Sequence, residues 1–176
     1  MKVCILGGTG LVGSSLVKNL KNKYEVYSPT RIELNLLNLY EVSTYFTLNN
    51  FDVVINCAAD TRSQMIVPNE VCANNVNIFL NLYNNKDKFK RFINFGSGAE
   101  FDRNYDITNM YEDELYNKFP TDIYGMSKQI CSKLSFITEN FYTLRLFGVF
   151  GINEPDTRLL KKVKPNSDIN IDRKST

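Results

Sequence analysis

The first apolar run of the chain, 3–6, leads directly into a turn that carries glycine at positions 7, 8, 10 and 13. An amphipathic segment, 11–22, follows at once. This order predicts a β-strand, a tight turn and a helix. In such a turn Gly7 permits the sharp bend, Gly10 lets a pyrophosphate approach the backbone, and Gly13 lets the helix pack closely on the strand. The N–H groups that begin the helix would receive phosphate charge, so the pattern predicts a dinucleotide site, with a purely structural turn as the alternative.

Short apolar runs alternate with helix-length segments along the rest of the chain. Strands are expected at 24–27, 53–56, 92–95 and 142–147, and helices at 39–48, at 75–85 and from Thr121 or Asp122 through Leu134. Alternation of this kind is typical of βαβ units. The sequence therefore predicts an α/β fold, a Rossmann-type doubly wound parallel sheet flanked by helices. From residue 151 onward the pattern weakens, with one strand-like stretch at 168–171.

The absence of histidine limits the chemistry of this chain. Its 176 residues include no His, which excludes a Ser-His-Asp triad, a Cys-His dyad and a His-ligated zinc site. Acid–base chemistry would have to come from Tyr, Lys, Cys or carboxylates. Four cysteines without a C-x-x-C pair predict buried thiols and no metal site.

The charge balance and the hydropathy pattern bear on the location and the partners of the protein. Lys and Arg number 21 against 19 Asp and Glu, so no broad basic surface for nucleic acid is expected. The apolar run near the N-terminus is too short for a signal peptide or a membrane span. We therefore expect a cytoplasmic protein without a nucleic-acid or membrane partner.

The residues that follow the second predicted strand bear on the choice of cofactor. An acidic residue at that tip would bind the ribose 2′-hydroxyl of NAD, whereas an Arg would neutralise the 2′-phosphate of NADP. The sequence there is Tyr-Ser-Pro-Thr-Arg, ending at Arg31. It favours NADP and leaves NAD open, the alternative being that Arg31 is a solvated loop residue and Glu33 takes part instead.

A second constellation carries candidate catalytic residues. Tyr124 and Lys128 are four positions apart on a predicted helix and so share one face. A neighbouring ammonium favours the phenolate form of a tyrosine, which makes it a usable acid or base. Ser97 follows the predicted strand 92–95 at its carboxyl end, where doubly wound sheets bind ligands. Its hydroxyl could bind a substrate oxygen beside Tyr124, although a surface Tyr-Lys pair is the alternative.

Together, the glycine turn, the Ser97 segment and the Tyr-Gly-Met-Ser-Lys run resemble the extended short-chain dehydrogenase/reductase family of NAD(P)-dependent nucleotide-sugar epimerases, dehydratases and reductases. The resemblance implies a catalytic set of Ser97, Tyr124 and Lys128. It implies a cofactor-binding set of Gly7, Thr9, Gly10, Leu11, Val12, Gly13, Arg31, Asn35, Leu36, Cys57, Ala58, Ala59, Asn75, Tyr124, Lys128 and Phe147. Several of these, such as Cys57 and Phe147, have core packing as an alternative.

Within that family the segment 30–37 looks most like the GDP-fucose synthase branch, with two departures. The epimerising cysteine of that branch is Ala99 here, and its partner histidine cannot exist in this chain. The resemblance then implies reduction or 4-epimerisation of a nucleotide-activated sugar by hydride transfer at C4, with Tyr124 as acid–base, and leaves a homodimer open.

The length of the chain is short for that resemblance. We expect residues 1–151 to form the NAD(P)-binding domain and 152–176 to begin a substrate lobe that is absent or minimal. The chain is then either a fragment or a naturally short member. A catalytically incompetent dinucleotide-binding module, acting as a redox sensor or assembly partner, is the alternative function.

Overall fold

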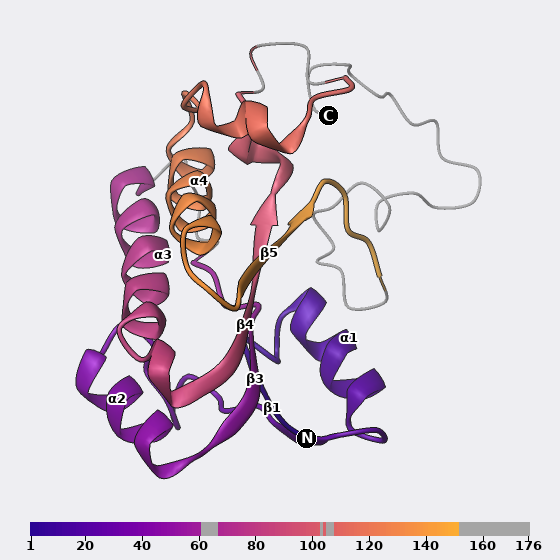
Figure 1. Ribbon diagram of the computed structural model, residues 1–176, viewed down its shortest axis with the longest axis vertical. Coiled ribbons are helices and arrows are strands. Elements are labelled where there is room, and N and C mark those ends of the chain that lie inside the picture. Colours follow the sequence, from indigo (N-terminus) through magenta and orange to yellow (C-terminus); the bar gives the residue numbers. More distant parts are fainter. Residues whose placement is uncertain (61–66, 103, 105–107, 152–176) are drawn as a thin grey trace.

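Parallel strands alternate with helices throughout the computed structural model, which describes residues 1–60, 67–102, 104 and 108–151 (Figure 1). The strands are β1 (Lys2–Leu6), β2 (Glu25–Tyr27), β3 (Phe51–Asn56), β4 (Phe89–Ser97) and β5 (Phe141–Leu146). The α-helices are α1 (Leu11–Leu20), α2 (Leu39–Leu48), α3 (Pro68–Tyr83) and α4 (Ile123–Phe136). The described residues also form the short 3₁₀ helices η1 (Lys86–Lys88), η2 (Gly98–Glu100) and η3 (Glu112–Tyr116).

The strands form one parallel sheet in the order β2-β1-β3-β4-β5. From β1 the chain first adds β2 on one side and then crosses back to add β3 on the other. The carboxyl ends of β1 and β3 meet at this reversal, where Leu6 is in register with Asn56. Ligands of doubly wound sheets bind at such a point. The predicted Rossmann-type, doubly wound sheet is confirmed.

Helices cover both faces of the sheet (Figure 1). Side chains of a strand alternate between the faces, and β1 shows this clearly. Val3 and Ile5 pack with Leu16, Val17 and Leu20 of α1. On the opposite face, Cys4 and Leu6 belong to a larger cluster with residues of α2, α3 and α4, which include Val42, Phe46, Phe79, Leu82 and Cys131.

Helix α3 and strand β4 differ most from their predicted bounds. Helix α3 begins at Pro68 rather than near residue 75, because proline suits the first turn of a helix and the Asn-rich turns that follow are poor helix signals. Strand β4 begins at Phe89 and includes Lys90 and Arg91. Both of these charged side chains are exposed, so this part of the strand is not an apolar run in the sequence. The predicted start of α4 is confirmed, with Asp122 accepting the Gly125 N–H at 2.8 Å. The strand expected at 168–171 lies outside the described residues.

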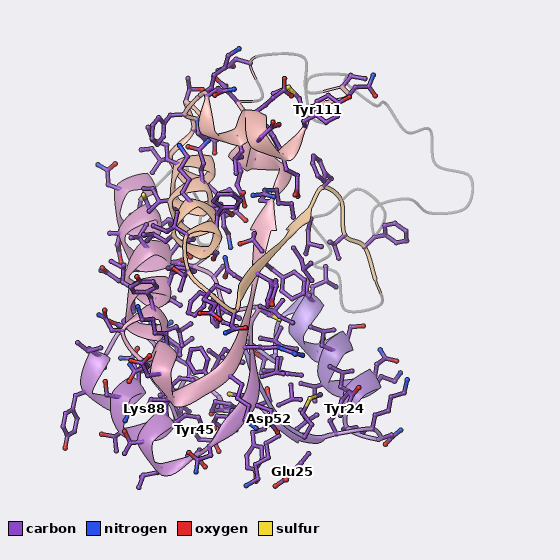
Figure 2. The ribbon with its side chains drawn as sticks, in the orientation of Figure 1. Tyr24, Glu25, Tyr45, Asp52, Lys88 and Tyr111 are labelled. Carbon is purple, nitrogen blue, oxygen red and sulfur yellow. The ribbon has the colours of Figure 1, made fainter. Side chains whose placement is uncertain are left out.

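The amino ends of the strands are tied together by one carboxylate. Asp52 accepts the backbone N–H of Lys2 at 2.8 Å and pairs with the Lys90 ammonium at 2.6 Å. These contacts hold the pKa of Asp52 below its usual range. Figure 2 shows Asp52 and Glu25 at one end of the sheet and Tyr111, next to η3, at the other. The candidate site lies at the end where the strands finish, opposite Asp52.

Candidate active site

A pocket of about 390 Å³ opens at the carboxyl ends of β1, β2 and β3. Nine of the residues predicted to bind a cofactor line it: Gly7, Thr9, Gly10, Arg31, Asn35, Leu36, Cys57, Ala58 and Ala59. The lining also includes residues that the sequence did not single out: Leu6, Gly8, Pro29, Thr30, Leu34, Leu37, Asp60, Asn74 and Ile78. The pocket therefore brings the glycine turn, the loop after β2 and the loop after β3 to one place.

The glycine turn packs closely on the neighbouring loop and on helix α1 at positions where a side chain would not fit. Gly7 has φ +74°, and a Cβ there would lie 2.6 Å from the Ala58 nitrogen. A Cβ on Gly13 would collide with the Gly7 carbonyl oxygen. Side chains are thus excluded from the contact between turn, helix and neighbouring loop. A cradle of this shape fits the pyrophosphate of a dinucleotide.

The first turn of α1 is prepared for an anion. Gly10 is its N-cap residue, no side chain caps this helix end, and no acidic residue lies in its first turn. Helix N-termini carry a partial positive charge from their N–H groups. An anion placed against Gly10 would meet that charge without competition from a carboxylate on the helix. The residues present therefore fit a dinucleotide phosphate.

Arg31 and Glu33 take different positions in the loop after β2. Arg31 lines the pocket and is exposed. The Glu33 carboxylate instead accepts the Thr30 N–H at 2.7 Å, and this contact lowers the pKa of Glu33. Glu33 is thus engaged in closing its own turn. Arg31 lines the pocket and Glu33 does not, which favours Arg31 as the residue near a 2′-phosphate, and the choice between them stays a prediction.

The loop after β3 is held by asparagines, among them Asn74, which donates to the Asp60 carboxylate at 2.7 Å. Asn56, at the end of β3, donates to Asn94 at 3.0 Å and accepts the Ala58 N–H at 3.1 Å. Asn75, in the middle of α3, accepts the Asp60 N–H at 2.7 Å and donates to the Asp60 carbonyl at 3.2 Å. The amide of Asn75 therefore clamps the loop that forms one pocket wall. It does not line the pocket itself, so its predicted cofactor contact stays a prediction.

Lys128 reaches from α4 toward the end of β4. Its ammonium donates to the Phe95 carbonyl at 3.1 Å and lies 5.8 Å from the centre of the Tyr124 ring. Burial lowers the pKa of Lys128, and the neighbouring Cys131, Glu100 and Cys57 oppose that shift. Phe95 follows Asn94, which is in register with Asn56, the residue before Cys57 of the pocket wall, so the ammonium lies on the strand next to that wall. Half-buried Tyr124 lies one turn earlier on the same helix.

Ser97 is the last residue of β4 and the N-cap of η2. Its Oγ accepts the Ala99 N–H at 3.2 Å, so the hydroxyl hydrogen remains free to donate elsewhere. Helix α4 packs directly on η2, because Gly125 has no side chain to strike the Ala99 carbonyl oxygen. The three predicted catalytic residues therefore come from two elements in contact, β4–η2 and α4. Their roles stay predictions.

The remaining predicted residues do not line this pocket. Leu11 and Val12 begin α1 and line a second groove, together with Leu146 and Phe150. Phe147 follows β5 and is 69% exposed, and its ring lies against Gly98 and stacks on Phe101 with centroids 6.3 Å apart. The described structure thus shows packing for Phe147 and leaves its nicotinamide contact a prediction.

The described residues offer neither a metal-ligand cluster nor a membrane-spanning helix. In the ranges given above, no three His, Cys, Asp or Glu side chains gather where they could hold a metal ion. None of the helices in this part of the chain combines the length and apolar character needed to cross a bilayer. All four cysteines are free thiols, and burial raises the pKa of Cys57 to about 12.

Comparison with known proteins gives one family match. Residues 3–169 match the model of the NAD dependent epimerase/dehydratase family. A search of curated proteins finds no match.

Solved structures resemble the chain in fold. A GDP-D-glycero-L-gluco-heptose synthase from Campylobacter jejuni, in the presence of NADPH, superimposes with a TM-score of 0.76 at 23% identity, over 88% of this chain and 49% of that one. A GDP-mannoheptose C4 reductase from Campylobacter jejuni with NADP bound gives 0.77 at 23% identity, over 88% and 53%. A GDP-L-fucose synthetase from Naegleria fowleri bound to NADP gives 0.72 at 17% identity, over 89% and 52%. The chain spans about half the length of these structures.

Proposed function

The chain belongs to the NAD dependent epimerase/dehydratase family, and from this we propose that it is the cofactor-binding and proton-transferring part of an NADP(H)-dependent enzyme that reduces or epimerises a nucleotide-activated sugar at C4. One observation carries the proposal. Lys128 reaches the end of β4 from α4, beside Tyr124 and on the strand next to the one that leads into Cys57 of the glycine-lined pocket. A pocket that only bound a dinucleotide would not need this pair beside it.

Different residues of the pocket would bind different parts of the cofactor. Gly7, Gly10 and the first turn of α1 would hold the pyrophosphate, and Arg31 would neutralise a 2′-phosphate, which favours NADP over NAD. Cys57, Ala58 and Ala59 would form the pocket wall beside a ribose of the cofactor. When bound, the nicotinamide supplies the hydride that reaches, or leaves, the sugar carbon.

Tyr124, Lys128 and Ser97 would manage the proton of the same reaction. In the reducing direction Tyr124 donates its phenolic proton to the sugar oxygen as that oxygen gains charge, and later regains a proton from solvent. The Lys128 ammonium lowers the free energy of the phenolate that remains. The Ser97 hydroxyl donates a hydrogen bond to the same oxygen.

The sugar class rests on the structural neighbours. A GDP-mannoheptose C4 reductase and a GDP-L-fucose synthetase share the fold, and both were solved with NADP. We propose residues 1–151 as the dinucleotide-binding domain and 152–176 as the beginning of a substrate lobe.

NADPH binding and NADPH oxidation test this function separately. Binding is measured by NADPH fluorescence, and turnover by loss of absorbance at about 340 nm with GDP- and dTDP-linked 4-keto sugars. Tyr124→Phe is expected to keep NADPH affinity and to lower kcat by about 100-fold or more, as general acids contribute at least that factor. Tyr111→Phe is the matched control, because Tyr111 is 75% exposed. Unchanged turnover in Tyr124→Phe contradicts the proposal, and NADPH binding without turnover of any sugar favours the non-catalytic module.

A further inference from the structure

A fully buried carboxylate lies next to Ser97. Glu100 is 0% exposed, and its Oε1 accepts the backbone N–H of Ser97 at 2.8 Å. Its Oε2 accepts from Nε of Arg145 in β5, also at 2.8 Å. Arg145 extends through Nη1 to the exposed Glu112 carboxylate at 2.7 Å. Glu100 thus joins the end of β4 to the neighbouring strand by one charged contact.

The surrounding chain makes room for this carboxylate. A Cβ on Gly96 would collide with Oε1 of Glu100, so glycine at this position is what lets the side chain fold back beside the strand. The Glu100 carbonyl in turn accepts a hydrogen bond of 3.1 Å from Nε2 of Gln129, a buried residue of α4. Strands β4 and β5 and helix α4 therefore meet at a single residue, and α4 is the helix that carries Tyr124 and Lys128.

A short turn alone does not require such a pair. Ser97 and Glu100 form a capping box, a motif that needs neither burial of the Glu nor an arginine partner, and burying a carboxylate is costly unless it is fully compensated. Here the buried Glu100 carboxylate is compensated by Arg145 and by the N–H of Ser97, the residue whose hydroxyl would contact the substrate. The contact fixes the backbone of Ser97, while the Ala99 N–H occupies one lone pair of Oγ and leaves the hydroxyl hydrogen to donate.

We propose that Glu100, neutralised by Arg145, is a positioning residue that holds Ser97 at the end of β4 so that its hydroxyl meets the reacting sugar oxygen. The inference rests on the proposed function. Glu100 acts through Ser97 and does not touch the substrate. Neither residue of the Glu100–Arg145 pair was indicated by the sequence, where they are separated by 45 positions.

Kinetics of Glu100→Gln test the role. Gln has the length of Glu but loses the charge that pairs with Arg145. We expect kcat to fall by about 100-fold, because small displacements of a reacting group cost that much, and the KM for NADPH to stay within about twofold. Glu112→Gln is the matched control, since it also touches Arg145 but is exposed, and it is expected to leave kcat unchanged. Loss of NADPH affinity in Glu100→Gln, at unchanged kcat, overturns the proposal.

A double-mutant cycle separates positioning from general destabilisation. If Glu100 acts through Ser97, then Glu100→Gln costs little further activity once Ser97 is replaced by alanine. Multiplicative losses in the double variant overturn the proposal. Should Glu100→Gln fail to fold because Arg145 loses its buried partner, the cycle uses Glu100→Gln with Arg145→Met, which removes both charges.

Hydrogen exchange of the Ser97 amide keeps this test distinct from that of the proposed function. In Glu100→Gln this amide is expected to exchange about tenfold faster or more, because a charged acceptor is lost, with the rest of β4 unchanged. Unchanged exchange overturns the proposal, whether or not the protein turns over a sugar. A protein that binds NADPH and reduces no nucleotide sugar contradicts the proposed function alone.

Discussion

Asn75 of α3 holds Asp60 by both backbone groups, accepting its N–H at 2.7 Å and donating to its carbonyl at 3.2 Å. Asp60 and the residues before it form the wall of the glycine-lined pocket. The helix on one face of the sheet therefore fixes the loop that follows β3. Because Asn75 is 6% exposed, its amide has little access to water as a substitute partner.

Asn75→Ala is expected to lower both stability and NADPH affinity. Removing the amide leaves the Asp60 backbone groups unpaired at a partly buried site, which costs about 1 to 3 kcal/mol in the free energy of unfolding. The loosened loop then binds NADPH more weakly. Urea unfolding and NADPH fluorescence titration measure the two effects. Asn77→Ala, at an exposed position of the same helix, should change stability by less than about 0.5 kcal/mol; equal effects of the two variants would contradict the clamp.

Arg31→Ala tests the choice of cofactor. A guanidinium paired with a 2′-phosphate contributes a charge-assisted contact, so NADPH affinity is expected to fall by about tenfold or more. NADH lacks that phosphate and should bind the variant as it binds the wild type. Lys23→Ala, which removes an exposed cation outside the pocket lining, serves as the charge control. Equal losses of affinity for NADPH and NADH would show that Arg31 does not bind the 2′-phosphate.

Local sequence patterns predicted the fold better than the contacts of the site. The strand, glycine turn and helix at the start of the chain were readable because each depends on neighbouring residues. The predicted bounds of α2, 39–48, are those observed, with Asn38 as its N-cap. The Asn75–Asp60 clamp and the Glu100–Arg145 pair depend on how distant elements pack, so no local spacing encodes them, and Asn75 is assigned to the cofactor by resemblance alone. The Ser-x-x-Glu spacing of Ser97 and Glu100 is a local capping-box signal that could have indicated Glu100.

Buried thiols predict a loss of stability at alkaline pH. Burial raises the pKa of Cys4 from an ordinary value of 9.0 to about 12. Between these values the unfolded thiol releases its proton and the folded thiol keeps it, so stability is complete below pH 9 and falls as pH rises toward 12. Cys4→Ala leaves a cavity at every pH but removes this dependence. Its stability deficit against the wild type, measured by urea unfolding, should therefore shrink above pH 9. A stability deficit that stays constant across that pH range would show that burial does not raise the pKa of the Cys4 thiol.

Gly7→Ala and Gly98→Ala form a matched pair, because the added methyl would meet its nearest atom at 2.6 Å in both. At Gly7 that atom is the backbone nitrogen of Ala58, and the backbone has φ +74°. Neither can relax cheaply, so we expect a loss of about 2 to 4 kcal/mol and weak NADPH binding. At Gly98 the methyl meets the ring of Phe147, which is 69% exposed and can swing away. Gly98→Ala should then cost less than about 1 kcal/mol, in keeping with a change at a flexible surface contact. Thermal unfolding and NADPH titration compare the two variants, and an equal loss of stability would mean that the Phe147 ring is held as firmly as the glycine turn.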